Sequence, residues 1–153
     1  MGDGTAETFL RGIVARGHES VLEHFSITVR FVCDRGVTHE LVRHRIASYS
    51  QQSTRYCNYS KGKYGGEISV IKPCYLQEGT FTYGTWKNAC AFAEQAYMTM
   101  LAHNCKAEEA RAVLPNSLAT EICMTANIRE LRTILKQRTS AAAHPQIREV
   151  MVE

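Results

Sequence analysis

The chain has 153 residues, of which 44% are hydrophobic and 22% are charged, and its formal net charge at pH 7 is +3. These values are close to globular averages, so they exclude a disordered or collagen-like chain and predict a single domain over residues 1–153. The longest apolar runs are a few residues, whereas a transmembrane helix needs ~20, so we expect no membrane segment. The six cysteines form no C-x-x-C pair, and residues 1–4 lack the positive charge and the apolar stretch of a signal peptide, so we expect reduced thiols, a cytoplasmic location and no metal site.

The N-terminal half combines a helical pattern with one clear strand. Apolar residues recur at helical spacing near the N-terminus, and apolar and polar residues then alternate in a stretch rich in β-branched and aromatic side chains. The expected elements are a helix at 5–16, a strand at 25–33, a turn at 34–36, a short helix at 37–45, a loop at 47–66 and a weak strand at 67–72.

The C-terminal half is mostly helical, with one further strand. Its expected elements are a long helix at 82–104, a short helix at 107–114, a strand at 118–126, a helix from 127 or 128 to 136, and a last helix at 146–152. Strands interleaved with helices, without a regular βαβ period, indicate an α+β fold. We expect a mixed or antiparallel sheet flanked by helices.

The segment most informative about chemistry is residues 43–56, which read RHRIASYSQQSTRY. It holds three arginines, one histidine, three serines and two glutamines, without an acidic residue to neutralise them. Arginine forks with hydroxyl and backbone donors suit phosphate groups. Arg43 and Arg45 are expected on different sides of a helix end, where they would serve different groups. The composition alone leaves a solvated basic face as an equal alternative.

This segment resembles the signature of the flavin-dependent thymidylate synthases: Arg-His-Arg, followed by Ser-Tyr-Ser-Gln-x-Ser-x-Arg-Tyr. Other stretches resemble the same family in the same order, with the segment GHESVLEHF at 17–25 upstream. The downstream matches are ARAVLP at 110–115, TANIREL at 125–131, Arg138, and HPQIRE at 144–149. The resemblance covers about residues 17–60 and 108–150, and the chain is expected to be short at both ends relative to the family.

The resemblance implies an enzyme that methylates dUMP to dTMP. Methylenetetrahydrofolate would supply the carbon, and FAD, reduced by NADPH, would supply the hydride, so the cofactor would carry the redox chemistry. In the family the working unit is a homotetramer whose sites are built from several subunits. The implied partners are therefore dUMP, folate, NADPH and further copies of the chain.

The resemblance also implies roles for individual residues. The positions similar to flavin contacts are Ser20, Arg43, His44, Arg45, Gln51, Asn127, Arg129 and Thr133. The positions similar to dUMP contacts are Glu40, Arg43, Gln51, Gln52, Ser53, Thr54, Arg55, Arg111 and Arg138. Arg138 is the expected catalytic residue, because a fixed cation at the uracil oxygens would stabilise negative charge as the ring is activated.

Several of these residues have a structural alternative. Arg138 ends a helix, where a cation is favourable for dipole reasons alone. Arg111 could pair with Glu108 or Glu109 on its own helix. Thr133 stands where the family more often has asparagine or histidine, and it retains one hydroxyl donor.

Two other functions stay open at this point. Arginines and lysines interleave with tyrosines over residues 43–64, which is also typical of a single-stranded nucleic-acid surface. The low net charge and the downstream matches do not favour that nucleic-acid module. The other alternative is a homologue that binds flavin and nucleotide without turnover.

Overall fold

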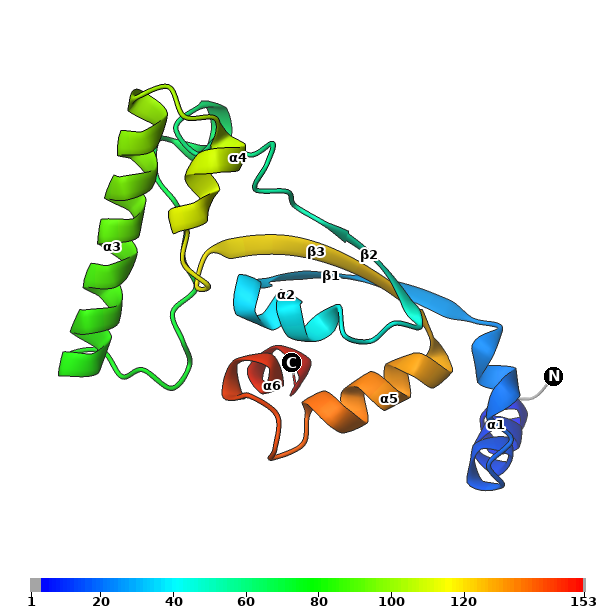
Figure 1. Cartoon of the computed structure of the whole chain (residues 1–153). Coiled ribbons are helices and arrows are strands. Elements are labelled where there is room, and N and C mark those ends of the chain that lie inside the picture. Colours follow the sequence, from blue (N-terminus) through cyan, green and yellow to red (C-terminus); the bar gives the residue numbers. More distant parts are fainter. Residues whose placement is uncertain (1–3, 153) are drawn as a thin grey trace.

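Three antiparallel strands form one sheet in the order β1–β3–β2 (Figure 1). They are β1 (Ser26–Asp34), β3 (Ala119–Asn127) and β2 (Ala47–Gln51). The computed structural model describes residues 4–152, except the side chain of Lys63. The strands predicted at 25–33 and 118–126 are confirmed to within one residue, and the α+β fold class is confirmed with a purely antiparallel sheet.

The strand β2 corrects the prediction of a loop over residues 47–66. Its side chains alternate, with Ala47, Tyr49 and Gln51 half-buried and the two serines between them exposed. Small polar residues have weak strand propensity, but β3 supplies a complete hydrogen-bonding edge, and Ala47 pairs with Ala126 of that strand. The weak strand predicted at 67–72 is wrong, because only a single bridge forms there, between Val70 and Leu118.

Three helices cover one face of the sheet: α2 (Arg35–Leu41), α5 (Ile128–Arg138) and α6 (Pro145–Val152) (Figure 1). Between these helices and the sheet lies a core whose most deeply buried members include Leu41 and Ile122. The remaining fully buried side chains of this core include Val37, Met124, Ile134 and Ile147. This packing fixes the positions of the ends of α2 and α5, from which the candidate site is built.

The helix α2 begins and ends earlier than the predicted 37–45. Asp34 caps its N-terminus, because the Oδ1 atom accepts a hydrogen bond from the backbone N–H of Val37 at 2.7 Å. At the other end, the Tyr49 hydroxyl lies 2.6 Å from the carbonyl oxygen of Leu41 and 2.9 Å from that of His44. The single hydroxyl hydrogen can be donated to only one of these carbonyls at a time, and α2 ends at Leu41. Residues 43–45 therefore lie in a turn, which corrects their predicted place on a helix end.

A second, smaller core lies at the other end of the molecule, around α3 (Phe81–Ala102) and α4 (Ala107–Ala110) (Figure 1). Its centre is Tyr97, which packs edge-on against Tyr59 at 5.6 Å between ring centroids. The predicted long helix is confirmed to within two residues. The predicted helix at 107–114 is divided into α4 and the 3-10 helix η3 (Arg111–Val113).

The N-terminal residues form α1 (Thr5–Ala15), which confirms the predicted first helix, and the 3-10 helix η1 (Glu19–Glu23). The η1 segment contacts α5. A third 3-10 helix, η2 (Gly62–Tyr64), lies in the long segment between β2 and α3. Among the helices of residues 4–152, none combines the length and the hydropathy that a membrane crossing requires.

Candidate functional site

Arg138, the last residue of α5, is bound to the end of α2 and to the turn after it by three hydrogen bonds. Its Nε–H donates to Nε2 of His44 at 2.9 Å, one Nη donates to Oε2 of Glu40 at 2.7 Å, and the other donates to the Glu40 carbonyl at 3.1 Å. The side chains of Arg138 and Glu40 are 18% and 31% exposed. We call Arg138, His44 and Glu40 the Arg138 cluster. Three residues predicted from separate motifs are thus brought together.

The imidazole of His44 is buried, with only 6% of its side chain exposed. Burial lowers the pKa of His44 below its ordinary value of 6.5, and the neighbouring Arg138 cation lowers this pKa further. The other ring nitrogen, Nδ1, lies 3.7 Å from Oε1 of Glu130, a carboxylate that is 11% exposed. His44 therefore lies between a cation and a carboxylate that both belong to α5.

Glu130 was missed as a site residue from sequence. It stands in the first turn of α5, where an acidic residue is favoured by the helix dipole, so it carried no distinctive signal. Glu130 and Arg138 are eight residues apart, about two helical turns, so they lie on the same face of α5. This spacing is the signal in the sequence that could have placed both residues near His44. Glu130 also raises the pKa of Tyr49, after burial as the main cause, while Arg138 lowers it.

The predicted flavin contacts Asn127 and Arg129 lie at the start of α5. The Oδ1 atom of Asn127 caps the helix by accepting a hydrogen bond from the backbone N–H of Glu130 at 2.8 Å. The guanidinium of Arg129 forms ion pairs with Glu23 and, at 3.3 Å, with Glu19. These contacts hold η1 against α5 and raise the pKa of Arg129.

An open cavity of about 750 Å³ adjoins this junction. Arg129, Arg132, Thr133 and Lys136 are among the residues that line it, and Ser20 is exposed on the neighbouring η1. Glu19 also lines the cavity and pairs with Arg129 at 3.3 Å and with Arg132 at 3.1 Å. The three cations outnumber this carboxylate, and with the Thr133 hydroxyl they form a donor set suited to a diphosphate. The residues present therefore fit the phosphate portion of a flavin dinucleotide. In this structure the Thr133 hydroxyl donates to the Arg129 carbonyl at 3.3 Å.

The predicted phosphate-binding residues are 51–55, and Gln51 is the last residue of β2. We call residues 52–55, which follow the strand directly, the phosphate segment. Gln52 donates to the Tyr64 hydroxyl at 2.7 Å, and Ser53 Oγ accepts from the backbone N–H of Arg55 at 3.3 Å. Thr54 is buried within the turn. The preceding Gln51 points its amide to the helix-covered face of the sheet. That amide donates to Thr38 Oγ1 at 3.0 Å and lies 3.5 Å from Thr120 Oγ1.

Arg55 and Arg111 both lie beside α4. Arg55 forms an exposed ion pair with Glu108 of α4 at 3.4 Å and lies over the ring of Tyr56. Arg111 is exposed on the adjoining η3. The carboxylates suggested as its structural partners are engaged elsewhere, because Glu109 accepts the backbone N–H that opens α4.

The phosphate segment and the Arg138 cluster make their contacts with different parts of the molecule. The cluster lies on the helix-covered face of the sheet, where the Tyr49 hydroxyl of β2 contacts the His44 carbonyl at 2.9 Å, whereas the phosphate segment follows the end of β2. Within residues 4–152, the phosphate segment makes its contacts with the region around α3 and α4 and with the backbone of Glu121, and no hydrogen bond or ion pair joins it to the Arg138 cluster. Arg43 and Arg45 are exposed on either side of His44, in the turn that precedes β2. One chain thus presents two separate groups of anion-binding side chains.

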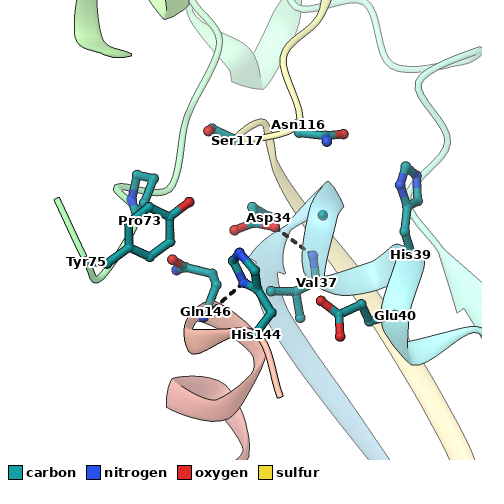
Figure 2. A pocket seen from close by; sticks show the side chains of 11 residues that line it. Asp34, Val37, His39, Glu40, Pro73, Tyr75, Asn116, Ser117, His144 and Gln146 are labelled. Atoms are coloured by element: carbon teal, nitrogen blue, oxygen red, sulfur yellow. Dashed lines mark hydrogen bonds between the residues drawn. The ribbon is translucent and has the colours of Figure 1, made fainter. Parts of the chain in front are cut away.

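A second cavity, of about 370 Å³, shares Glu40 with the Arg138 cluster (Figure 2). Asp34, Glu40, His144 and Gln146 surround it, with the Tyr75 ring on one side. The rings of Tyr75 and His144 meet edge-on at 5.7 Å. The cavity therefore combines carboxylates, imidazoles and an aromatic wall, and sequence reasoning identified only Glu40 among its residues.

Comparison with known proteins agrees with the resemblance seen in the motifs. The family model described as thymidylate synthase complementing protein matches residues 1–153. The flavin-dependent thymidylate synthase of Pyrococcus abyssi is 36% identical over 151 residues, covering 98% of this chain and 61% of the relative. That of Geobacter sulfurreducens is 38% identical over 146 residues, covering 95% of this chain and 61% of the relative. The chain thus spans about three fifths of the length of these curated relatives, and it belongs to the thymidylate synthase complementing protein family.

Proposed function

We propose that the chain carries flavin and nucleotide sites for the FAD-dependent methylation of dUMP to dTMP. Methylenetetrahydrofolate is the carbon donor and NADPH the reductant in this proposal. The observation that carries it is the Arg138 cluster, a fixed guanidinium in a chain whose relatives are named flavin-dependent thymidylate synthases. The six free cysteines support a cytoplasmic location for this reaction.

Arg138 is the residue proposed to act on the pyrimidine. A guanidinium has five N–H donors, and three of those of Arg138 are engaged with His44 and Glu40. Two Nη–H groups are left for the oxygens of a uracil ring. Because the cation is held in place before the ligand arrives, it stabilises developing negative charge on the ring with little reorganisation.

The flavin is proposed to lie along η1 and the start of α5. Arg129 and Arg132 would bind its phosphates, with Ser20 and Thr133 as hydroxyl donors and Asn127 at the helix start. The exposed Arg43 and Arg45 would bind the same cofactor, beside His44. When bound, the flavin supplies the hydride, and the protein residues bind, orient and polarise.

The phosphate of dUMP is proposed to bind at Ser53 and Arg55, the backbone of residues 52–54 and Arg111. Because no hydrogen bond or ion pair joins this group to the Arg138 cluster within residues 4–152, we infer that one nucleotide is bound by the phosphate segment of one copy and Arg138 of another. A homotetramer with shared sites satisfies this requirement. Such an arrangement would also bring Gln51 and Glu40 near the same ligand.

The proposal is tested by the absorbance spectrum of the purified chain before and after addition of FAD and then dUMP. We expect a bound oxidised-flavin spectrum that shifts with dUMP, and dTMP formation when folate and NADPH are added. A dUMP-sensitive flavin spectrum without turnover would instead identify a binding homologue that lacks activity.

A folded chain that binds no flavin would contradict the proposal. In that case the 81% exposed Tyr56, with Arg55 over its ring, favours the nucleic-acid alternative. Binding to a single-stranded oligonucleotide that weakens steeply with salt would then be expected.

A further inference from the structure

We propose that Glu130 is a positioning residue, which holds Arg138 in place by orienting the imidazole between them. Only the dUMP measurement given last rests on the proposed function. The contacts themselves connect Glu130, His44 and Arg138 in one line, from a carboxylate through a ring to a guanidinium.

The direction of the hydrogen bond to Arg138 determines the tautomer of His44. A guanidinium Nε–H can only donate, so Nε2 of His44, at 2.9 Å, must carry a lone pair. A neutral imidazole with that lone pair has its proton on Nδ1. The Nδ1–H group is the one that faces Oε1 of Glu130 at 3.7 Å. The carboxylate thus favours the tautomer that Arg138 requires.

The charges around His44 support this tautomer over a protonated ring. Glu130 and Arg138 of α5 face the ring directly, Glu40 of α2 lies on the far side of the guanidinium, and the Tyr49 hydroxyl of β2 bonds to the His44 carbonyl. Among the described residues, α6 contributes no hydrogen bond or ion pair to this ring. A proton on Nε2 would point at the Nε–H of Arg138, so this contact exists only while His44 is neutral.

A purely structural role for Glu130 makes a different prediction. As the third residue of α5, it also interacts favourably with the helix dipole. That role depends on its negative charge, whereas the orientation that we propose depends on an oxygen facing Nδ1–H, which from 3.7 Å needs a shift of about 0.5 Å to reach hydrogen-bond distance. Glu130→Gln keeps the acceptor and removes the charge, and Glu130→Ala removes both. Glu7 is the control for the helix-dipole role, because it is the third residue of another 11-residue helix, where it pairs with Arg11.

The experiment records the imidazole nitrogen and arginine Nε–H signals by NMR at pH 7.5, without ligand. Signals of His44 and Arg138 are assigned by their loss in His44→Gln and Arg138→Lys. We expect the Nδ1–H tautomer and a slowly exchanging Arg138 Nε–H in the unmodified chain. Both signals should persist in Glu130→Gln and Glu7→Ala, and the Arg138 Nε–H should exchange rapidly in Glu130→Ala.

A His44 proton on Nε2, or a protected Arg138 Nε–H in a folded Glu130→Ala, would overturn the inference. Loss of protection in Glu130→Gln to the same extent as in Glu130→Ala would also overturn it, because charge alone would then explain the role. If Glu130→Ala does not fold, the inference is still tested by the NMR signals of Glu130→Gln and by the His44 tautomer of the unmodified chain.

A second measurement connects the position of Arg138 to its ligand. With FAD bound, we expect the dUMP concentration for half-maximal flavin response to rise about tenfold in Glu130→Ala, which corresponds to ~1.4 kcal/mol, and much less in Glu130→Gln. An unchanged concentration in Glu130→Ala would contradict a positioning role. If the unmodified chain shows no flavin response at all, the proposed function fails, while the ligand-free signals still test the contacts.

Discussion

The Arg138 cluster and the phosphate segment are both rich in anion-binding groups, but they are held very differently. Arg138 makes three hydrogen bonds to two residues from α2 and the following turn, and its His44 partner is buried. Arg55 of the phosphate segment has one exposed ion pair at 3.4 Å, to Glu108. Exposed pairs of this kind contribute about 0–1 kcal/mol.

This difference indicates which half of the proposed site is complete within one chain. A cation held in a partly buried network needs no further ordering to meet a ligand, which is the condition for strong electrostatic stabilisation. An exposed arginine on a turn loses side-chain entropy when it binds. We therefore expect the phosphate segment to be ordered by the nucleotide and by a neighbouring copy, and the Arg138 cluster to exist beforehand.

Arg138→Ala should have the largest effect, because it removes the central member of the cluster. Charge-assisted hydrogen bonds contribute roughly 1.5–3 kcal/mol each, so we expect the affinity for dUMP to fall about 100-fold or more. The substitution also leaves Glu40 and His44 without this partner. The measurement is the dUMP titration of the flavin spectrum. Arg138→Lys is the control: it keeps the charge but loses the fork, so an affinity close to that of the unmodified chain would contradict the proposed geometry.

Arg55→Ala should weaken dUMP binding about tenfold while leaving stability nearly unchanged. Its side chain is half exposed, and surface substitutions usually change the free energy of unfolding by less than about 0.5 kcal/mol. Parallel urea unfolding and dUMP titrations check both parts. The opposite result, a clear loss of stability with normal binding, would make Arg55 a structural residue.

The pH dependence of stability should distinguish the two regions, because the buried imidazole lies in the Arg138 cluster. The folded pKa of His44 is lowered by burial and by Arg138, so the unfolded chain binds its proton first. The contribution of neutral His44 to the free energy of unfolding is therefore complete above pH 6.5, and it is lost as the pH falls below that value. Urea unfolding between pH 7.5 and 5 should show this loss, and His44→Gln should reduce it. The exposed His24 is the control, and an equal reduction in His24→Gln would contradict the assignment.

Glu108→Gln should have the smallest effect on stability, below about 0.5 kcal/mol, since it breaks only an exposed ion pair. It frees Arg55 from a competing carboxylate, so we expect the affinity for dUMP to stay equal or to increase slightly. Thermal unfolding and the same titration test this. A fall in affinity would show that Glu108 holds Arg55 in its binding position.

The sequence predicted elements well where the local pattern decides the structure. The alternation in 25–33 and 118–126 and the helical spacing near the N-terminus each led to an element found within one or two residues. β2 was missed because its strand conformation depends on pairing with β3, more than 70 residues away. The end of α2 at Leu41 was also missed, and the hydroxyl that contacts its last carbonyl belongs to Tyr49 of the following strand.

The candidate site was predicted from motifs, and its connections required the fold. Glu40, His44 and Arg138 were each assigned from a resemblance, but no local pattern indicated that they contact one another across 94 and 98 residues. Glu130 was overlooked because a first-turn acid is ordinary in a helix. The different partners of Arg55 and Arg138 among the described residues also became visible only in the fold.

The most direct test of a site shared between copies is complementation between two variants. Arg138→Ala and Arg55→Ala are purified separately, unfolded and refolded together in equal amounts, loaded with FAD and titrated with dUMP. If each site takes Arg138 from one copy and Arg55 from another, random assortment leaves both arginines at about a quarter of the sites, and a matching part of the high-affinity dUMP response should return. A mixture with no more high-affinity response than the separate variants, in a sample shown to contain mixed oligomers, would contradict the shared site.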